Sequence, residues 1–388
     1  MRICFLITAT NVAGGANRSM LDLLPYLLSK GHTCSVIMNG HGTMEEELRS
    51  IGVPYAIIPF LSDIRRKGWK TNAAKKLTNI YAGWQIQNYL RKEKIDLFHN
   101  NSLPVIVGME AAGKAGVPYI CHIRENVWEG LGSEFYDRDK VRDVITKAGA
   151  TIVISDYIRR VYEAFAPAAR FVQVYDGIQI EDYYEEKPIF TGDEAEAAII
   201  GVVNPHKNQK EAVKAAKLLK KEGRGIRLTV VGSFGKWHES RSYGENLAAY
   251  VEREKMDYVT FREPIEDKEE LRALRRRCDI NLICSKAEGM GRTTIESMLS
   301  GCLTIAADAG ATPEIIKDGE TGLLYRLGDA KDLAAKIRYA LDHGEEMQAI
   351  AKAGQQYALS AFDPGSYCES ILDIYESVLK NGRAENSR

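Results

Sequence analysis

Residues 281–322 read NLICSKAEGMGRTTIESMLSGCLTIAADAGATPEIIKDGETG. The segment begins with an apolar run that ends near Cys284, continues through a glycine-containing loop, and enters a helical pattern at about Thr293. A second apolar run, Leu303 to Ala307, follows. At the start of a helix the unpaired backbone N–H groups and the positive end of the helix dipole point the same way. A strand, a glycine loop and a helix in this order therefore predict a phosphate-binding site.

The loop and the helix also contain the candidate site residues of this segment. Glu288 and Glu296 offer carboxylate oxygens that can accept hydrogen bonds from sugar hydroxyls. The same residues can also be explained by local helix and turn structure alone. Thr293 and Glu296 have the spacing of a helix capping box, and Gly289 and Gly291 could serve only to shape a turn.

Length and composition suggest a globular protein of two domains. A chain of 388 residues is too long for one ordinary core, and 45% hydrophobic with 27% charged residues is close to average. The formal net charge of -1 gives no reason to expect a nucleic-acid partner. Seven cysteines are scattered without a C-x-x-C pair, which indicates small core residues in a reducing compartment.

The N-terminal residues do not resemble a signal peptide, and no apolar run approaches the roughly 20 residues that span a bilayer. We therefore expect a cytoplasmic protein, at most peripheral on the inner face of the plasma membrane.

Short apolar runs alternate with helical patterns through the first half of the chain. This alternation predicts an α/β fold with a doubly wound parallel sheet, whose ligands bind at the carboxyl ends of the strands. The strand candidates are Ile3–Ala9, Thr33–Met38, Tyr55–Ile58, Leu97–His99, Tyr119–His122 and Thr151–Ile154.

Gly14 and Gly15 follow the first predicted strand, at such an end. Glycines there let the backbone pass close to another molecule. The pair could equally be a structural turn, because the G-x-G-x-x-G fingerprint of dinucleotide binding is absent.

His99 and His122 end strands on the same predicted edge. We interpret His99 as a packing residue. His122 begins the polar run HIREN, where the chain leaves the sheet, and we predict a functional role in hydrogen bonding or proton transfer. No metal is expected, since no clustered His/Cys spacing exists.

The segment from Arg65 to Lys94 departs from the neutral average. It contains nine basic residues against one acidic residue, a local net charge of +8, with Trp69, Tyr81, Trp84 and Tyr89 interleaved. It could be a solvated helical face. The alternative is a surface attracted to anionic lipid, with tryptophans at headgroup depth.

A polar stretch from Glu181 to Glu196 predicts a linker, after which a second series of strands and helices begins at Ala197. Lys207 follows the first strand of this series, where its ammonium group could neutralise a phosphate. Taken alone, such a lysine is usually an ordinary surface residue. Two such domains, each with a ligand-binding strand edge, predict a cleft between them.

These motifs resemble those of family 4 retaining glycosyltransferases with the GT-B fold. The most specific match is Glu288-x7-Glu296, followed by GATPEIIKDGETGLL. The first-domain Gly-Gly loop, His122, VYDGI and GVVNPHKNQ are also similar, so the resemblance covers nearly the whole chain.

The resemblance implies two Rossmann-like domains facing a cleft. Residues 1–185 with 364–388 would form the acceptor-side domain, which includes a returning C-terminal helix. Residues 190–363 would bind the nucleotide-sugar donor.

The resemblance also implies a role for each site residue. Glu296 would hold the ribose hydroxyls, Glu288 would lie against the donor sugar, and Lys207 would neutralise the departing diphosphate. Gly14 and Gly15 would approach from the other side, and no cofactor or catalytic metal is expected. The donor contacts would also include the backbone of Gly289, Met290, Gly291, Arg292 and Thr293.

The chain departs from the family pattern at one position. Val202 stands where the family commonly has an arginine that assists the lysine. Arg292 or another cation, such as protonated His206, would have to replace it.

The sequence therefore predicts a retaining glycosyltransferase that uses a UDP- or GDP-sugar and acts by an internal-return mechanism, with Glu288, His122 and Lys207 as catalytic residues. The acceptor is expected in cell-surface polysaccharide or glycolipid synthesis. The alternatives are a sugar-nucleotide epimerase, a sugar phosphorylase, or a non-catalytic subunit of this fold. Nucleic-acid binding is not expected.

Overall fold

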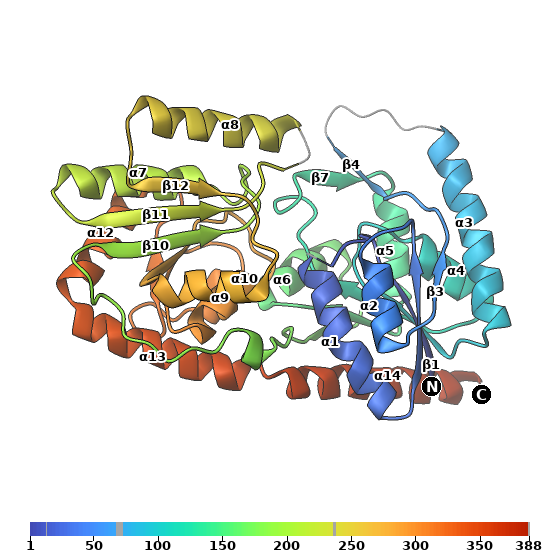
Figure 1. Ribbon diagram of the computed structural model, residues 1–388. Coiled ribbons are helices and arrows are strands. Elements are labelled where there is room, and N and C mark those ends of the chain that lie inside the picture. The colour runs from blue at the N-terminus through green and yellow to red at the C-terminus, as the bar shows by residue number, and fades with distance from the viewer. Residues whose placement is uncertain (13, 67–72, 236–237, 387–388) are drawn as a thin grey trace. The chain divides into compact units, whose positions relative to one another are not determined.

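A computed structural model describes residues 1–12, 14–66, 73–235 and 238–386 (Figure 1). The chain forms two compact units. Unit 1 comprises Met1–Gly177 and Pro364–Arg388, and unit 2 comprises Ile178–Asp363.

A seven-stranded parallel sheet forms the centre of unit 1, in the order β3-β2-β1-β5-β6-β8-β9. Its strands are β1 (Arg2–Leu6), β2 (Thr33–Met38), β3 (Tyr55–Ile57), β5 (Leu97–Asn100), β6 (Tyr119–Ile123), β8 (Ala150–Val153) and β9 (Phe171–Gln173). A separate antiparallel pair joins β4 (Ile64–Arg66) to β7 (Ser133–Phe135).

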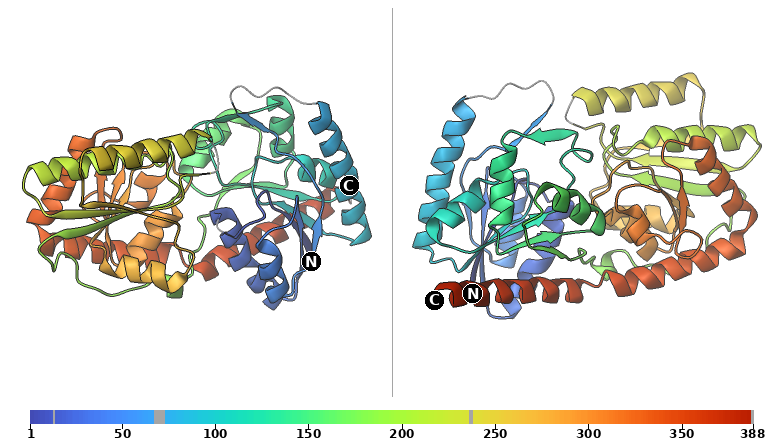
Figure 2. Two further views of the ribbon diagram at one scale, coloured as in Figure 1. Left: turned by 45° about the horizontal axis from the view of Figure 1, so that its top comes forward. Right: turned by 180° about the vertical axis from the view of Figure 1, so that it is seen from behind.

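Helices cover the unit 1 sheet. They are α1 (Gly15–Ser29), α2 (Met44–Ile51), α3 (Ala73–Lys92), α4 (Val107–Ala115), α5 (Arg138–Thr146), α6 (Asp156–Phe165) and α14 (Pro364–Asn386). Apolar side chains of α1 and α14 share one core with the sheet, and Figure 2 shows α14, in red, running beside unit 1. On α4, Gly108 brings the helix close to the sheet, because a Cβ there would lie 2.5 Å from the Phe98 ring.

A six-stranded parallel sheet forms the centre of unit 2, in the order β12-β11-β10-β13-β14-β15. Its strands are β10 (Ala195–Ile200), β11 (Ile226–Val231), β12 (Val259–Arg262), β13 (Ile280–Ile283), β14 (Leu303–Ala307) and β15 (Leu323–Tyr325).

Apolar clusters on both faces hold the unit 2 sheet. Successive β10 residues point to opposite faces, so Ala197 joins one cluster and Ala198 the other. The helices are the 3-10 turn η1 (Ile180–Asp182), α7 (Gln209–Lys221), α8 (His238–Arg253), α9 (Lys268–Arg277), α10 (Arg292–Leu299), α11 (Thr312–Ile315), α12 (Ala330–Asp342) and α13 (Gly344–Ala361).

The predicted fold class is confirmed, because both sheets are parallel and doubly wound. The division between units differs from the predicted boundaries. It falls between Gly177 and Ile178, before the polar stretch that was expected to be a linker. That stretch packs on unit 2: Glu185 accepts hydrogen bonds from Arg272 and Arg276 at 2.6 and 2.7 Å.

The strand order reverses once in each sheet. In unit 1 the chain goes outward from β1 through β2 and β3, and then returns to β5 on the other side of β1. In unit 2 the same reversal lies between β10 and β13. Loops that leave the carboxyl ends of these neighbouring strands diverge and open a crevice, which is where ligands bind in such sheets.

Candidate functional site

The loops that follow β10 and β13 meet at the reversal point of unit 2. The backbone N–H of Lys286 donates to the carbonyl of His206 at 2.9 Å. The Lys207 ammonium donates to the Glu288 carboxylate and forms an ion pair with it. Two predicted site residues that are 81 positions apart in the sequence are therefore in direct contact.

The sequence NPHKNQ sets the position of Lys207. The Asn204 side chain accepts hydrogen bonds from the backbone N–H groups of His206 and Lys207, at 2.9 and 2.8 Å. Asn208 adopts the left-handed conformation that asparagine tolerates, and α7 begins directly after it. An asparagine-stabilised turn of this kind fixes the backbone that carries the lysine.

Glu288 is an ionised carboxylate. Burial by itself would raise the pKa of Glu288, but the charge and hydrogen bond of Lys207 and a hydrogen bond from Ser285 hold this pKa below its usual value. Ser285 donates to the carboxylate at 2.6 Å. At neutral pH Glu288 can therefore accept hydrogen bonds or balance a cation, but it cannot donate a proton.

Gly310, in the loop after β14, closes the site around Glu288. Its φ of +60° is in the left-handed region, and a Cβ there would lie 2.7 Å from the backbone N and O of Glu288. Next to it, Ala311 donates to the Glu288 carbonyl at 3.0 Å. Backbone packing on this side and the Lys207 contact on the other together set the position of Glu288.

The capping-box interpretation of Glu296 is wrong. Helix α10 begins at Arg292, its N-cap is Gly291 with φ +84°, and no side chain caps it. Glu296 instead accepts a hydrogen bond from Arg275 of α9 at 2.5 Å. Both side chains are nearly buried, so this is a partly desolvated ion pair.

Sequence reasoning missed Arg275. It is one of three consecutive arginines at the end of α9, and the sequence pattern does not show which of the three turns inward. Its neighbours Arg276 and Arg277 are exposed, whereas Arg275 is buried.

Val202 lies in the same region and is 45% exposed. Arg292, the suggested replacement for the missing arginine, has its Nε 4.0 Å from the Glu296 carboxylate. Its role at a diphosphate therefore stays a prediction.

In unit 1, the loops after β1 and β5 also meet at a reversal point. The Asn101 side chain donates to the carbonyl of Ala16 at 2.9 Å, and Asn17 donates to the carbonyls of Ala9 and Asn11. Gly14 is the N-cap of α1, and among the described residues beyond its own chain neighbours no atom lies within 4 Å of the place that a Cβ would occupy. The space beside Gly14 is open, but the predicted donor contact of Gly14 and Gly15 stays a prediction.

The two histidines lie in a buried polar network of unit 1. His99 bonds to the hydroxyl of Tyr375 on α14 at 2.6 Å, and His122 Nδ1 lies 3.2 Å from His99 Nε2. Burial, and secondly the charge of Arg124, lower the pKa of both histidines well below the usual value.

Arg124 and Asp176 complete this network. No sequence pattern predicted their contact. The Arg124 guanidinium donates to both Asp176 oxygens at 2.6 Å, 52 positions away in the sequence. His99 is thus a packing residue, as predicted. His122 is enclosed, with Nε2 lacking a hydrogen-bond partner within the described part of the chain, and its catalytic role stays a prediction.

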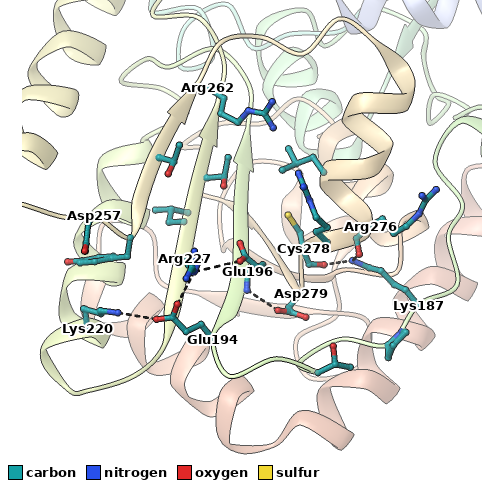
Figure 3. A pocket seen from close by; sticks show the side chains of 18 residues that line it. Lys187, Glu194, Glu196, Lys220, Arg227, Asp257, Arg262, Arg276, Cys278 and Asp279 are labelled. Atoms are coloured by element: carbon teal, nitrogen blue, oxygen red, sulfur yellow. Dashed lines mark hydrogen bonds and ion pairs between the residues drawn. The ribbon is translucent and has the colours of Figure 1, made fainter.

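A polar pocket of about 1020 Å³ lies elsewhere in unit 2 (Figure 3). It is lined mainly by residues at or before the amino ends of the strands, and none of Lys207, Glu288, Arg292 and Glu296 lines it. Several of its charges neutralise one another, since Glu194 pairs with Lys220 and Arg227. Parallel sheets bind ligands at the opposite ends of their strands, so this pocket does not mark the site.

Across the described ranges, no group of three or more His, Cys, Asp or Glu residues could hold a metal ion. All seven cysteines are buried, as the sequence predicted for core residues. No helix within those ranges is both long and apolar enough to cross a bilayer.

Two units, each with a doubly wound parallel sheet whose strand order reverses once, are the architecture of the GT-B fold. Comparison with known families agrees. The family described as Glycosyltransferase Family 4 matches residues 13–182, and the family described as Glycosyl transferases group 1 matches residues 181–357. The chain belongs to the glycosyltransferases that these two consecutive domain families describe.

Two similar curated proteins are also named as glycosyltransferases. EpsD of Bacillus subtilis, named as a glycosyltransferase, is 28% identical over 264 residues, which span 65% of this chain and 66% of EpsD. The uncharacterized glycosyltransferase MJ1178 of Methanocaldococcus jannaschii is 22% identical over 83% of this chain and 84% of its own length.

Solved structures show the same fold at low identity. HepE of Anabaena, solved with UDP and glucose, has a TM-score of 0.78 at 20% identity and covers 97% of this chain and 100% of its own. A glycosyltransferase from Rickettsia africae has a TM-score of 0.79 at 18% identity, over 98% and 99% of the two chains.

Proposed function

We propose that this glycosyltransferase moves a sugar from a nucleoside-diphosphate sugar to an acceptor hydroxyl with retention at the anomeric carbon. The observation that carries the proposal is the contact between Lys207 and ionised Glu288 at the reversal point of unit 2, beside the first turn of α10. A cation, a helix N-terminus and a hydrogen-bond acceptor are the groups that a sugar diphosphate requires.

In the proposed reaction the bond between the anomeric carbon and the diphosphate oxygen breaks, and its electron pair leaves with the nucleoside diphosphate. Lys207 and the positive end of α10 stabilise the developing negative charge. The acceptor oxygen then forms its bond to the anomeric carbon on the same face, and its proton passes to the departing phosphate oxygen.

The two glutamates would position the donor rather than transfer protons. Glu288 is ionised, so it would accept hydrogen bonds from hydroxyls of the donor sugar. Glu296 would accept hydrogen bonds from the ribose hydroxyls, and Arg275 would orient its carboxylate from behind.

A uridine diphosphate sugar is the first donor to test, because the similarly folded HepE was solved with UDP and with UDP-glucose. A GDP-sugar is the second. We propose an acceptor of cell-surface polysaccharide or glycolipid synthesis, lipid-linked and reached at the inner face of the plasma membrane. The +8 charge of residues 65–94 supports attraction to that anionic surface.

The test is release of nucleoside diphosphate by the purified full chain from a panel of nucleotide sugars, with and without sugar and lipid-linked acceptors. Lys207→Ala should lower the transfer rate at least about 100-fold, which corresponds to about 2.7 kcal/mol of barrier. Lys214→Ala is the matched control, because Lys214 is an exposed lysine of the adjoining helix α7. Equal rates for the two variants would contradict the placement of the diphosphate.

The same assay separates the alternatives. Nucleoside diphosphate release that requires an acceptor indicates transfer, whereas interconversion of the sugar without an acceptor indicates epimerisation. The absence of any turnover, with every donor, would favour a non-catalytic subunit, an alternative that the valine at position 202 supports. If Glu296→Ala keeps full turnover and donor affinity, the ribose assignment is wrong.

A further inference from the structure

Helix α3 presents a continuous row of large apolar side chains to solvent. Leu77, Ile80, Tyr81 and Trp84 are 68%, 70%, 60% and 57% exposed. Their spacing of three, four and seven positions places them on one side of the helix. Single exposed apolar residues are ordinary, but four that adjoin one another usually mark an interaction surface.

This row is not needed for the core of unit 1. Helix α3 packs against α4, and its inward face consists of Ala82, Ile86 and Leu90, which are fully buried. The helix therefore has two apolar faces, and the described residues cover only one of them. The rings of Tyr81 and Trp84 stack at 5.9 Å and give the outer face a rigid aromatic centre.

A groove of about 600 Å³ extends the exposed face. Ile80 and Trp84 line this groove and also belong to the row, so the two apolar surfaces are continuous. Ile106, Val107 and Val141 add apolar lining from α4, α5 and the adjoining loop.

The charges around this face are those that an anionic partner requires. Helix α3 contains no acidic residue, and Lys76 and Lys114, at the rim of the groove, make no ion pair with any described residue. The groove also contains three acidic groups, equal in number to its lysines Lys76, Lys114 and Lys140, so the excess of positive charge comes from helix α3 itself. Glu110 pairs with a lysine at 2.8 Å, and Asp63 and Asp137 each accept a backbone N–H.

The basic segment that the sequence singled out overlaps this face. Lys67, Trp69 and Lys70 of that segment lie outside the described residues, so the face is defined here by Leu77, Ile80, Tyr81 and Trp84 alone.

We propose that this face of α3 enters the interfacial region of an anionic lipid bilayer. Tyrosine and tryptophan beside lysines are the side chains that suit the depth of lipid headgroups. A second copy of the chain or a partner helix would need complementary acidic or apolar surface, whereas the bilayer supplies both anionic charge and hydrocarbon. The lipid contact itself does not depend on the proposed function. Its use, which would be access to a lipid-linked acceptor, rests on the proposed function.

The test is sedimentation of the full chain with vesicles of phosphatidylcholine alone and of phosphatidylcholine with phosphatidylglycerol, at low and high salt. The wild type should bind the anionic vesicles, and part of this binding should survive high salt, because apolar insertion is not screened. Leu77→Gln/Ile80→Gln should lower the partition coefficient at least about tenfold. Leu131→Gln, at an exposed leucine outside this face, should bind like the wild type.

Fluorescence adds a second readout. Anionic vesicles should shift the tryptophan emission of the wild type to shorter wavelength, and Trp84→Phe should reduce this shift. Equal binding by the wild type and the double variant, abolished in both by salt, would show that only the lysines attract lipid and would overturn the proposal. A wild-type dimer that ignores vesicles and that the double variant dissociates would also overturn it, in favour of a second copy.

Nucleotide-sugar hydrolysis without vesicles separates this proposal from the proposed function. The double variant should hydrolyse donor as the wild type does, since both substituted side chains are on the surface of unit 1. Vesicle binding by a chain that turns over no donor would leave the lipid contact in place and count against the proposed function alone.

Discussion

The ion pair between Arg275 and Glu296 sets the orientation in which the Glu296 carboxylate can accept hydrogen bonds from a ligand. The carboxylate is held at 2.5 Å by a guanidinium that is itself buried, so its orientation is set before any ligand arrives. A preorganised acceptor of this kind costs a ligand less to bind than a mobile one.

Arg275→Met should lower the free energy of unfolding by about 1–3 kcal/mol, because the nearly buried Glu296 carboxylate loses the guanidinium that is hydrogen-bonded to it, while Arg292 stays 4.0 Å away. Urea denaturation would measure the loss. Arg277→Met is the matched control on the same helix turn, at an exposed side chain, and should change stability by less than about 0.5 kcal/mol. Similar losses in the two variants would contradict the assigned pairing.

His99 and His122 should make unit 1 sensitive to acid. Both have a lowered pKa in the folded state, so the unfolded chain binds more protons once the pH falls below the unfolded value of about 6.5. Stability should therefore be lost as pH falls from about 6.5 toward 5, by up to about 1.4 kcal/mol per pH unit for each histidine.

The measurement is urea denaturation of the wild type and of His122→Asn across that range. The variant should lose less stability per pH unit, and His238→Asn, at an exposed position, should not differ from the wild type. The readout is the difference between the wild type and the variant in how the free energy of unfolding changes with pH. Neither curve alone is sufficient, because burial raises the pKa of Glu125, and protonation of Glu125 opposes the loss of stability in the same pH range. Parallel curves for His122→Asn and the wild type would refute the assignment.

The loop between β14 and α11 acts as a support for the loop that carries Glu288. Its contact depends on the absence of a side chain at Gly310, whose φ is positive and whose neighbours are backbone atoms. Gly328 provides a comparison, because it has φ +85° but no atom of the described residues beyond its chain neighbours lies within 4 Å of the place that a Cβ would occupy.

Gly328→Ala should cost about 1–2 kcal/mol, which is the penalty for the left-handed conformation alone. Gly310→Ala should cost at least about 1 kcal/mol more, because the added methyl group must displace the Glu288 backbone. Thermal unfolding would measure both variants. Equal costs would mean that the two loops do not touch as described.

Helix α14 makes the first and last parts of the chain one folding unit. It supplies Tyr367, Ile371, Tyr375 and Val378 to the core of unit 1, and the Tyr375 hydroxyl reaches His99 across 276 sequence positions. Gly149 lets the helix approach, since a Cβ there would lie 2.4 Å from Val378.

Tyr375→Ala should therefore destabilise unit 1 by about 3–5 kcal/mol, and Tyr375→Phe by about 1 kcal/mol. Hydrogen exchange resolved by peptide should show faster exchange in β1 and β5, which share this core, and little change in β13 of unit 2. Asp373→Ala, on the exposed side of the same helix, is the control. Uniform destabilisation of both units would contradict this assignment of α14.

Periodic apolar patterns and local turn signals predicted most of the secondary structure. Thr33–Met38 and Leu303–Ala307 were predicted with their observed bounds, since a buried parallel strand is a continuous apolar run flanked by polar residues. The helix predicted from about Thr293 begins at Arg292, but the capping box of Thr293 and Glu296 was wrong, because the N-cap is the left-handed Gly291.

The sequence by itself determined the alternation of strands and helices, the family, and the identity of Lys207, Glu288 and Glu296 as candidate site residues. Only the tertiary structure decided that Lys207 contacts Glu288, that Arg275 rather than its neighbours holds Glu296, and that α3 has an uncovered apolar face. The physical reason is the sequence separation of the residues that interact. Periodicity and capping are set by residues within a few positions of one another, whereas an ion pair or an exposed face depends on which distant segments the fold brings together.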